Sequence, residues 1–182
     1  MADGPLLPEQ IVICDVDGGF CDAARLHFGR REGLEVVQGR LEDLPRMDCI
    51  VWPGNSHAVP TSGLDTALSR LAGPGVLQRV RALLAADFGD EGAPAGTAWL
   101  VAADGAGHCS PEADGASSGP PHCVVYTVVF PRSRDGPRLA MHGALEAMAR
   151  HNGEAQHGAL PEPPAPASAP SQVRLTWTWS RR

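Results

Sequence analysis

The sequence predicts an α/β protein, a three-layer α/β/α sandwich with a mixed sheet, and three observations support this prediction. Short apolar runs that end in turn-forming residues alternate with segments whose apolar residues recur at helical spacing. The predicted order, β-α-β-β-α-α-β-β-α, places helices on both faces of a mostly parallel or mixed sheet. With 182 residues, of which 43% are hydrophobic, the chain can bury one core of ordinary size.

The N-terminal third of the chain predicts three strands and one helix. Its strands are apolar runs bounded by turn-forming residues, and its helix shows apolar residues three and four positions apart. The strands are expected at 11–14, 34–38 and 48–52, and the helix at 20–28. We expect Pro53 and Gly54 to stop the third strand, because neither residue favours a continuing strand.

The middle of the chain predicts two consecutive helices and two strands before a last helix. The first helix carries an apolar stripe at positions i, i+3, i+4 and i+7, formed by Leu64, Ala67, Leu68 and Leu71. The same spacing recurs in the segments 76–88 and 138–151. Strands are expected at 97–102 and 122–130, and the second of these is rich in β-branched residues.

The domain organisation follows from a change of composition after residue 152. We expect one domain over 1–152, in which 104–121 is an inserted loop rich in Gly, Ser, Pro and Ala. The segment 153–182 is predicted to be a Pro/Ala-rich tail, because its composition offers little to pack into a core. Apolar and polar residues alternate at 173–180, which is typical of a short half-buried strand.

Composition and charge exclude several classes of function. All 15 basic residues are Arg, which excludes mechanisms that require a Lys, such as Walker-type phosphate loops and Schiff-base enzymes. The net charge of -6 argues against direct binding of nucleic acid. We expect no membrane span, because no apolar run reaches the ~18 residues that one requires. Without a secretory signal, the chain is expected in the cytoplasm, and its five cysteines are expected to be mostly buried thiols.

A first candidate site is the acidic pair of Asp15 and Asp17 after the first strand. Asp-x-Asp-Gly at a strand end resembles the opening motif of haloacid-dehalogenase-like phosphatases, in which the first Asp attacks phosphorus. That chemistry also needs a cation, normally Lys, and a late acidic pair for magnesium. The chain has neither, so we favour an ordinary turn.

A second candidate is a zinc site formed by two His-Cys pairs, His108-Cys109 and His122-Cys123. Thiolate and imidazole are suitable ligands, but structural zinc sites normally space paired ligands two to four residues apart. Adjacent residues on a strand also point to opposite faces. We therefore expect no metal and no cofactor.

The third candidate combines a strand end with the start of a helix. Asn55 follows a buried strand, and Ser62 and Gly63 open the amphipathic helix that follows. Free backbone N–H groups in a first helical turn attract anions, and ligands of open α/β sheets lie at the carboxyl ends of strands. Ser62 and Asp65 also form an ordinary capping pair, which could do no more than start the helix.

Several of these segments, in this order, resemble the macro domain, the ADP-ribose-binding module, and particularly its Appr-1-p-processing-like branch. The resemblance covers roughly residues 10 to 152 and implies that family's α/β/α fold. Its motifs are Asp-Cys-Ile-Val-Trp-Pro-Gly-Asn-Ser at 48–56, Thr-Ser-Gly-Leu-Asp-Thr-Ala-Leu at 61–68, the strands at 95–101 and 124–131, and the helix at 138–151.

The resemblance implies roles for particular residues. Asn55 would contact the distal ribose, and Ser62, Gly63 and Leu64 would cradle the diphosphate through backbone N–H groups. In hydrolytic members, the Asn and acidic positions of this region help to position or activate a water. Asn55 and Asp65 are therefore the candidate catalytic residues.

The chain departs from the family's pattern in three places. Arg40 stands where the family has its adenine-binding Asp, and Thr61-Ser62-Gly63 replaces a run of three glycines. The family's C-terminal strand and second phosphate loop are not recognisable, although the strand expected at 173–180 could restore the former. Glu42, Asp15 or Asp17 could substitute for the adenine-binding Asp.

Two functions stay open on this basis. The first, which the resemblance implies, is binding of ADP-ribose or of an ADP-ribosylated macromolecule, with or without hydrolysis of ADP-ribosyl esters or of ADP-ribose 1''-phosphate. Alternatively, it is a non-catalytic interaction protein on a degenerate macro scaffold that no longer binds nucleotide.

Overall fold

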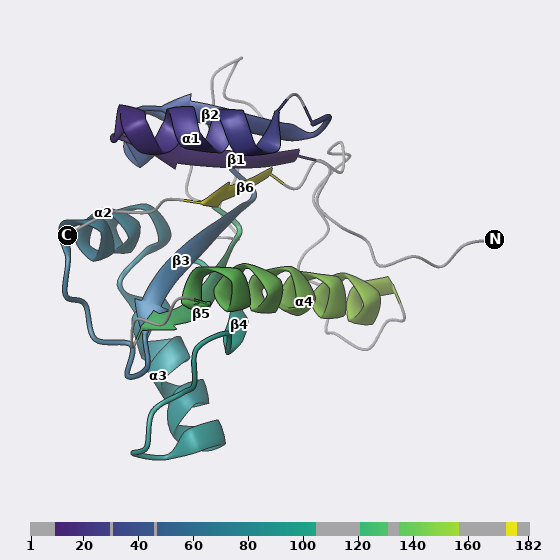
Figure 1. Cartoon of the computed structure of the whole chain (residues 1–182). Helices are drawn as coiled ribbons and strands as arrows, with labels where there is room; N and C mark the ends of the chain where they lie inside the picture. Colours follow the sequence, from purple (N-terminus) through teal and green to yellow (C-terminus); the bar gives the residue numbers. More distant parts are fainter. Residues whose placement is uncertain are drawn as a thin grey trace, which may run out of the picture.

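The computed structural model describes residues 10–29, 31–45, 47–104, 121–130, 135–156 and 174–177 (Figure 1). The elements up to the last helix follow the predicted order with one 3-10 turn added, and a strand lies within the range 173–180 where a short one was expected. They are β1 (Gln10–Asp15), α1 (Gly18–Phe28), β2 (Leu34–Gln38), η1 (Leu41–Asp43), β3 (Cys49–Asn55), α2 (Gly63–Ala72), α3 (Gly75–Phe88), β4 (Ala98–Ala102), β5 (Cys123–Phe130), α4 (Gly136–Gln156) and β6 (Arg174–Trp177).

The strands form one mixed sheet of order β2-β1-β6-β3-β5-β4. Neighbouring strands are parallel except β4, which runs antiparallel to β5 at one edge. Parallel strands need covered faces, and their sequences are correspondingly apolar in near-continuous runs. β5 is an example, because the six residues from Val124 to Val129 are all buried.

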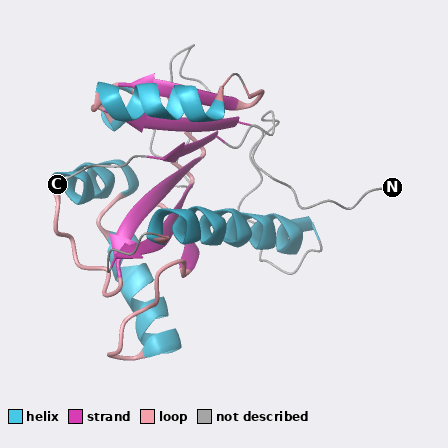
Figure 2. Cartoon of the chain, viewed as in Figure 1, coloured by secondary structure: helices cyan, strands magenta, loops and turns pink. Residues whose placement is uncertain are grey.

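Helices cover both faces of the sheet, which confirms the predicted three-layer α/β/α sandwich (Figure 2). Alternate residues of β3 and β5 point to opposite faces. Trp52 and Tyr126 share one buried cluster with residues of α2 and α3. Val51 and Val125 share the other with residues of α1 and α4. The core is therefore two apolar layers separated by the sheet.

β3 continues past the point at which the sequence predicts its end. Pro53 and Gly54 both lie within the strand, which ends at Asn55. Of the residues of β3, only Cys49 and Ile50 pair with β6, so within the described ranges the second half of β3 has β5 as its one strand neighbour. A proline there is tolerated as on an edge strand. A Cβ atom at Gly54 would overlap the phenol of Tyr126, so the strand needs glycine at this position.

The C-terminal part of the described chain contributes to the middle of the sheet. α4 runs four residues beyond the boundary expected at 152, to Gln156. β6 falls within 173–180 and pairs with β1 on one side and β3 on the other. Most of the inserted loop expected at 104–121 and the Pro/Ala-rich part of the tail lie outside the described residues. The division at 152 stays a prediction.

Asp104 joins β4 to the junction between α2 and α3. One carboxylate oxygen of Asp104 accepts a hydrogen bond from the Gly75 backbone N–H at 2.7 Å, and the other pairs with the Arg79 guanidinium at 2.6 Å. The Asp104 backbone N–H donates to the Ala72 carbonyl. The hydrogen bond from Arg79, and then that from Gly75, lower the pKa of the Asp104 carboxyl group.

We expect Asp104→Asn to lower the free energy of unfolding by about 1 kcal/mol at pH 7, because it weakens the hydrogen bond at the start of α3 and removes the ion pair. Since the pKa of Asp104 is lowered in the folded protein, its contribution is present above the ordinary value of 3.8 and is lost as the pH falls through the lowered pKa. Urea denaturation at pH 7 and in acid measures this loss.

Asp22→Asn is the matched control, because Asp22 forms an exposed ion pair with Arg25 within one helix. Its effect should be below about 0.5 kcal/mol. Equal effects of the two substitutions, or an Asp104→Asn effect that persists unchanged in acid, would contradict the role given to Asp104.

Candidate functional site

The predicted site residues lie between the end of β3 and the first turn of α2. Asn55 is the last residue of β3, and a loop leads from it to Ser62, the residue that caps α2 (Figure 1). Gly63, Leu64 and Asp65 form the first turn of the helix. The site therefore lies at the carboxyl end of a central parallel strand, the usual place for ligands in open α/β sheets.

The side chain of Asn55 holds its own loop in shape. Its Oδ1 accepts hydrogen bonds from the backbone N–H groups of His57 and Val59, each at 3.1 Å. Its Nδ2 donates to the Val59 carbonyl at 2.6 Å. Asn favours such turns, because its side chain can replace a backbone partner. One of the two Nδ2 hydrogens remains beyond these bonds.

Asp65 is a buried carboxylate with hydrogen-bond donors at both oxygens. Its side chain is 7% exposed. Oδ1 accepts from the indole N–H of Trp52 at 2.9 Å, and Oδ2 accepts from the backbone N–H groups of Thr61 and Ser62 at 2.7 and 2.8 Å. The Ser62 hydroxyl also donates to Oδ2 at 2.9 Å. Asp65 therefore ties β3, the loop and α2 together.

Ser62 and Asp65 form a reciprocal capping box, as the sequence spacing allows. The Ser62 hydroxyl oxygen accepts from the Asp65 backbone N–H at 3.2 Å, while the Asp65 carboxylate accepts from the Ser62 backbone N–H. The backbone N–H group of Ser62, predicted to contact diphosphate, is thus already bonded within the chain.

The next two backbone N–H groups differ from that of Ser62. Among the described residues, the N–H groups of Gly63 and Leu64 have no hydrogen-bond partner, as expected for the first turn of a helix. A Cβ atom at Gly63 would meet nothing within 4 Å, so the space beside Gly63 is open. Two of the three predicted cradle residues therefore keep donors for a ligand.

Two residues that sequence reasoning missed also hold the loop. The hydroxyl of Tyr126 on β5 donates to the Asn55 carbonyl at 2.9 Å, and burial raises its pKa. Nε of Arg81 on α3 donates to the Ala58 carbonyl at 3.0 Å. Ala58 is buried and has a φ of 52°, a left-handed conformation that is uncommon for residues other than glycine.

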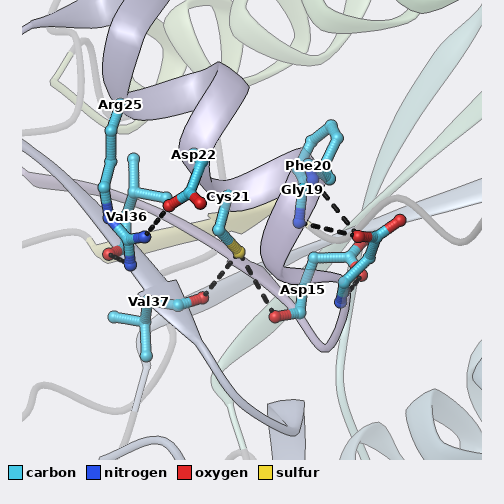
Figure 3. Close-up of polar contacts among 9 residues, drawn as sticks. Asp15, Gly19, Phe20, Cys21, Asp22, Arg25, Val36 and Val37 are labelled. Carbon is cyan, nitrogen blue, oxygen red and sulfur yellow. Dashed lines mark hydrogen bonds and ion pairs between the residues drawn. The ribbon is translucent and has the colours of Figure 1, made fainter.

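Asp15, the last residue of β1, and Asp17 form a turn and a helix cap, and Figure 3 shows Asp15 with Gly19 and Phe20 at the start of α1. Oδ1 of Asp17 accepts from the backbone N–H groups of Gly19 and Phe20, at the start of α1. Oδ1 of Asp15 accepts from the Asp17 backbone N–H at 2.9 Å, and Asp15 is 6% exposed. The Cys21 thiol donates to the Asp15 carbonyl. This geometry fits the ordinary turn that the sequence analysis favoured over a phosphatase motif.

The two His-Cys pairs that were weighed and rejected as a zinc site are only partly described. His108 and Cys109 lie outside the described residues. The Cys123 thiol faces the Asp48 carbonyl at 3.8 Å and the thiol of Cys49, whose pKa is raised by its hydrogen bond with Cys123 and by burial. Within the described ranges, no three His, Cys, Asp or Glu side chains gather as a metal site would require.

Arg40 occupies the position at which the resemblance implies an adenine-binding acid. Its side chain is 69% exposed and pairs with Glu42 at 3.3 Å. A guanidinium group can only donate hydrogen bonds, so it cannot accept one from an amino group of a base. Glu42, which could substitute for the adenine-binding acid, already forms this ion pair with Arg40.

We expect Asp65→Ala to lower the free energy of unfolding by about 3 kcal/mol, because it leaves the buried Trp52 indole N–H and two loop N–H groups without their acceptor. Asp87→Ala is a matched control, since Asp87 accepts from the indole N–H of Trp99 at 2.8 Å on the exposed surface. Its cost should stay below about 1 kcal/mol. Urea denaturation gives both values, and similar losses would contradict the structural role of Asp65.

Within the described ranges, no helix combines the length and the apolar character needed to cross a lipid bilayer.

Comparison with known proteins gives a distant structural likeness. No protein-family model and no curated protein sequence matches the chain. A mutant macrodomain of Oceanobacillus iheyensis solved with ADPR has 16% sequence identity and a TM-score of 0.43, over 65% of this chain and 57% of that chain. A second mutant has 12% identity and a TM-score of 0.41, over 77% and 80%. The same macrodomain with ADP has 16% identity and a TM-score of 0.38, over 61% and 52%.

The chain thus spans about half the length of two of these three structures. Because the TM-scores are near 0.4, this likeness supports no statement about the ligands or the activity of this chain. The sequence motifs of this chain resemble those of the macro domain, and the solved structures to which it has this distant likeness are macrodomains.

Proposed function

We propose that this chain binds ADP-ribose or an ADP-ribosylated ligand at the carboxyl end of β3, with the diphosphate on the first turn of α2. One observation carries the proposal. The N–H groups of Gly63 and Leu64 have no partner among the described residues, and the space beside Gly63 is open. Such N–H groups, aligned with the helix dipole, favour an anion.

The loop in front of this turn supports the proposal because its shape is fixed before any ligand arrives. The side chains of Asn55, Asp65, Tyr126 and Arg81 each bond to the backbone of residues 55–62. A binding site that is already ordered loses less conformational entropy when its ligand binds. The ligand would therefore meet donors that are already in position.

Asn55 is the proposed contact for a ribose hydroxyl. Its Oδ1 is occupied by two backbone N–H groups, so the contact would use the second hydrogen of Nδ2. The same side chain then both shapes the loop and binds the sugar. Asn55→Ala would disturb both at once and is therefore a poor test of binding alone.

Hydrolysis of an ADP-ribosyl linkage, with Asn55 and Asp65 as the catalytic pair, has less support than binding. Both carboxylate oxygens of Asp65 are already engaged, so activating a water there would require one of these hydrogen bonds to break. The contacts favour Asp65 as a residue that positions the loop. Release of ADP-ribose from a modified protein, or of phosphate from ADP-ribose 1''-phosphate, tests hydrolysis separately, with Asp65→Asn as the variant.

One observation favours the second candidate, a non-catalytic interaction protein that no longer binds nucleotide. The backbone N–H groups of Thr61 and Ser62 are bonded to Asp65 rather than left for a ligand. A diphosphate would therefore have fewer donors than a loop of three glycines would offer. Failure of the wild-type chain to bind ADP-ribose would support this candidate.

The binding test replaces one backbone donor without disturbing the helix. Gly63→Pro removes the Gly63 N–H at the first helical position, where proline is well tolerated. The preceding Ser62 is extended, with φ -141° and ψ 164°, which suits a residue before proline. Calorimetry should show micromolar binding of ADP-ribose by the wild type and about tenfold weaker binding by Gly63→Pro, since a lost charge-assisted hydrogen bond costs about that much.

Gly63→Ala is the matched control, because it keeps the N–H group and adds a methyl group in open space. Its affinity should stay within about twofold of the wild type. No heat with millimolar ADP-ribose, or equal affinities for the Pro and Ala variants, would overturn the proposed function. Equal urea midpoints would show that the Pro variant is folded.

A further inference from the structure

We propose that Arg81 is a further binding residue of this site, and that its guanidinium group contacts a phosphate oxygen of the ligand. The inference rests on the proposed function, since it adds a side chain to the same anion site. Arg81 lies on α3, whereas the proposed backbone donors lie on α2. The contact would therefore clamp the anion between two helices that follow each other in the chain.

The position of Arg81 is fixed by the loop itself. Its Nε donates to the carbonyl of Ala58 at 3.0 Å, midway between Asn55 and the start of α2. Ala58 is fully buried, and its left-handed φ of 52° belongs to the same fixed loop. The Nε bond thus holds the guanidinium group against the loop. The two Nη groups, which carry four further N–H donors, remain beyond that bond.

The charge of Arg81 is not balanced by a neighbouring carboxylate. Among the described residues, no Asp or Glu oxygen lies within ion-pair distance of its guanidinium group, although the chain carries a net charge of -6. Other arginines do have such partners, for example Arg25, Arg79 and Arg138. The Arg81 side chain is also exposed, so a ligand can reach it.

The hydrogen bond to Ala58 places the Arg81 charge on the loop that leads from Asn55 to the first turn of α2. The Tyr126 hydroxyl donates to the Asn55 carbonyl at the start of this loop. Burial is the main cause that raises its pKa, and the charges of Asp65 and Arg81 have smaller, opposite effects on it. Arg81 and Asp65 therefore act on the same hydroxyl group. A phosphate at Gly63 and Leu64 would meet the negative charge of Asp65, and the positive charge of Arg81 offsets this repulsion.

The chemistry of arginine suits this task. Its planar guanidinium group presents paired N–H donors that match two oxygens of a phosphate, and it stays charged at any physiological pH. The ligand class is therefore a phosphate or diphosphate. Arg81 adds the charge that the backbone donors of α2 lack.

The test compares Arg81→Gln with Arg70→Gln, which removes an equal charge from the exposed surface of α2 towards its other end. Affinities for ADP-ribose are measured by calorimetry at several salt concentrations. We expect Arg81→Gln to bind about tenfold more weakly at low salt, and its affinity to depend less on salt than that of the wild type. Arg70→Gln should match the wild type in both respects.

A purely structural role of Arg81 would change affinity without changing its dependence on salt. Arg81→Lys keeps the charge but loses the planar pair of donors, so its salt dependence should be retained and its affinity should lie between those of the wild type and Arg81→Gln. Unchanged salt dependence in Arg81→Gln, or equal losses in Arg70→Gln, would overturn the inference.

Inorganic pyrophosphate separates this inference from the proposed function. If the wild type binds pyrophosphate but not ADP-ribose, and Arg81→Gln weakens pyrophosphate binding about tenfold, the proposed function fails and the role of Arg81 stands. If the wild type binds ADP-ribose and Arg81→Gln binds both ligands as tightly as the wild type, the proposed function stands and the role of Arg81 fails.

Discussion

The carboxylate of Asp65 is the contact on which the rest of the site depends. It is buried and accepts a hydrogen bond from the indole N–H of Trp52 on β3. It also accepts from the backbone N–H groups of Thr61 and Ser62 and from the Ser62 hydroxyl, which caps α2. A buried carboxylate is tolerable only when such donors surround it. The strand, the loop and the helix are therefore joined through one side chain, and none of them can shift without losing a partner for it.

This arrangement divides the donors of the loop into two groups. Those of Thr61 and Ser62 stabilise the fold, because they satisfy Asp65. Those of Gly63 and Leu64 point beyond the helix and have no partner within the described chain. The residue that makes the loop rigid also occupies two N–H donors that the proposed anion site would otherwise offer. Rigidity and the number of ligand contacts are therefore in direct competition at this site.

Most of the fold could be predicted from the sequence because its signals are local. Apolar runs and helical spacing marked every strand and helix up to α4, and the Ser62–Asp65 spacing marked the cap of α2. The continuation of β3 through Pro53 was missed, since it depends on how far β6 extends along its neighbour. The loop contacts of Tyr126 and Arg81 were missed for a similar reason. Their partners at Asn55 and Ala58 are distant in sequence, and no local pattern indicates them.

The central position of β6 has a consequence for how the protein reaches its native state. β2 and β1 form one part of the sheet, β3, β5 and β4 form the other, and β6 is the strand that hydrogen-bonds to both. Until Arg174–Trp177 inserts, the facing edges of β1 and β3 carry unpaired backbone groups of the kind that recruit strands from other molecules. Because the pairing of β6 with β1 joins residues near opposite ends of the described chain, it should be slow, and chains that lack β6 would be the species most exposed to aggregation.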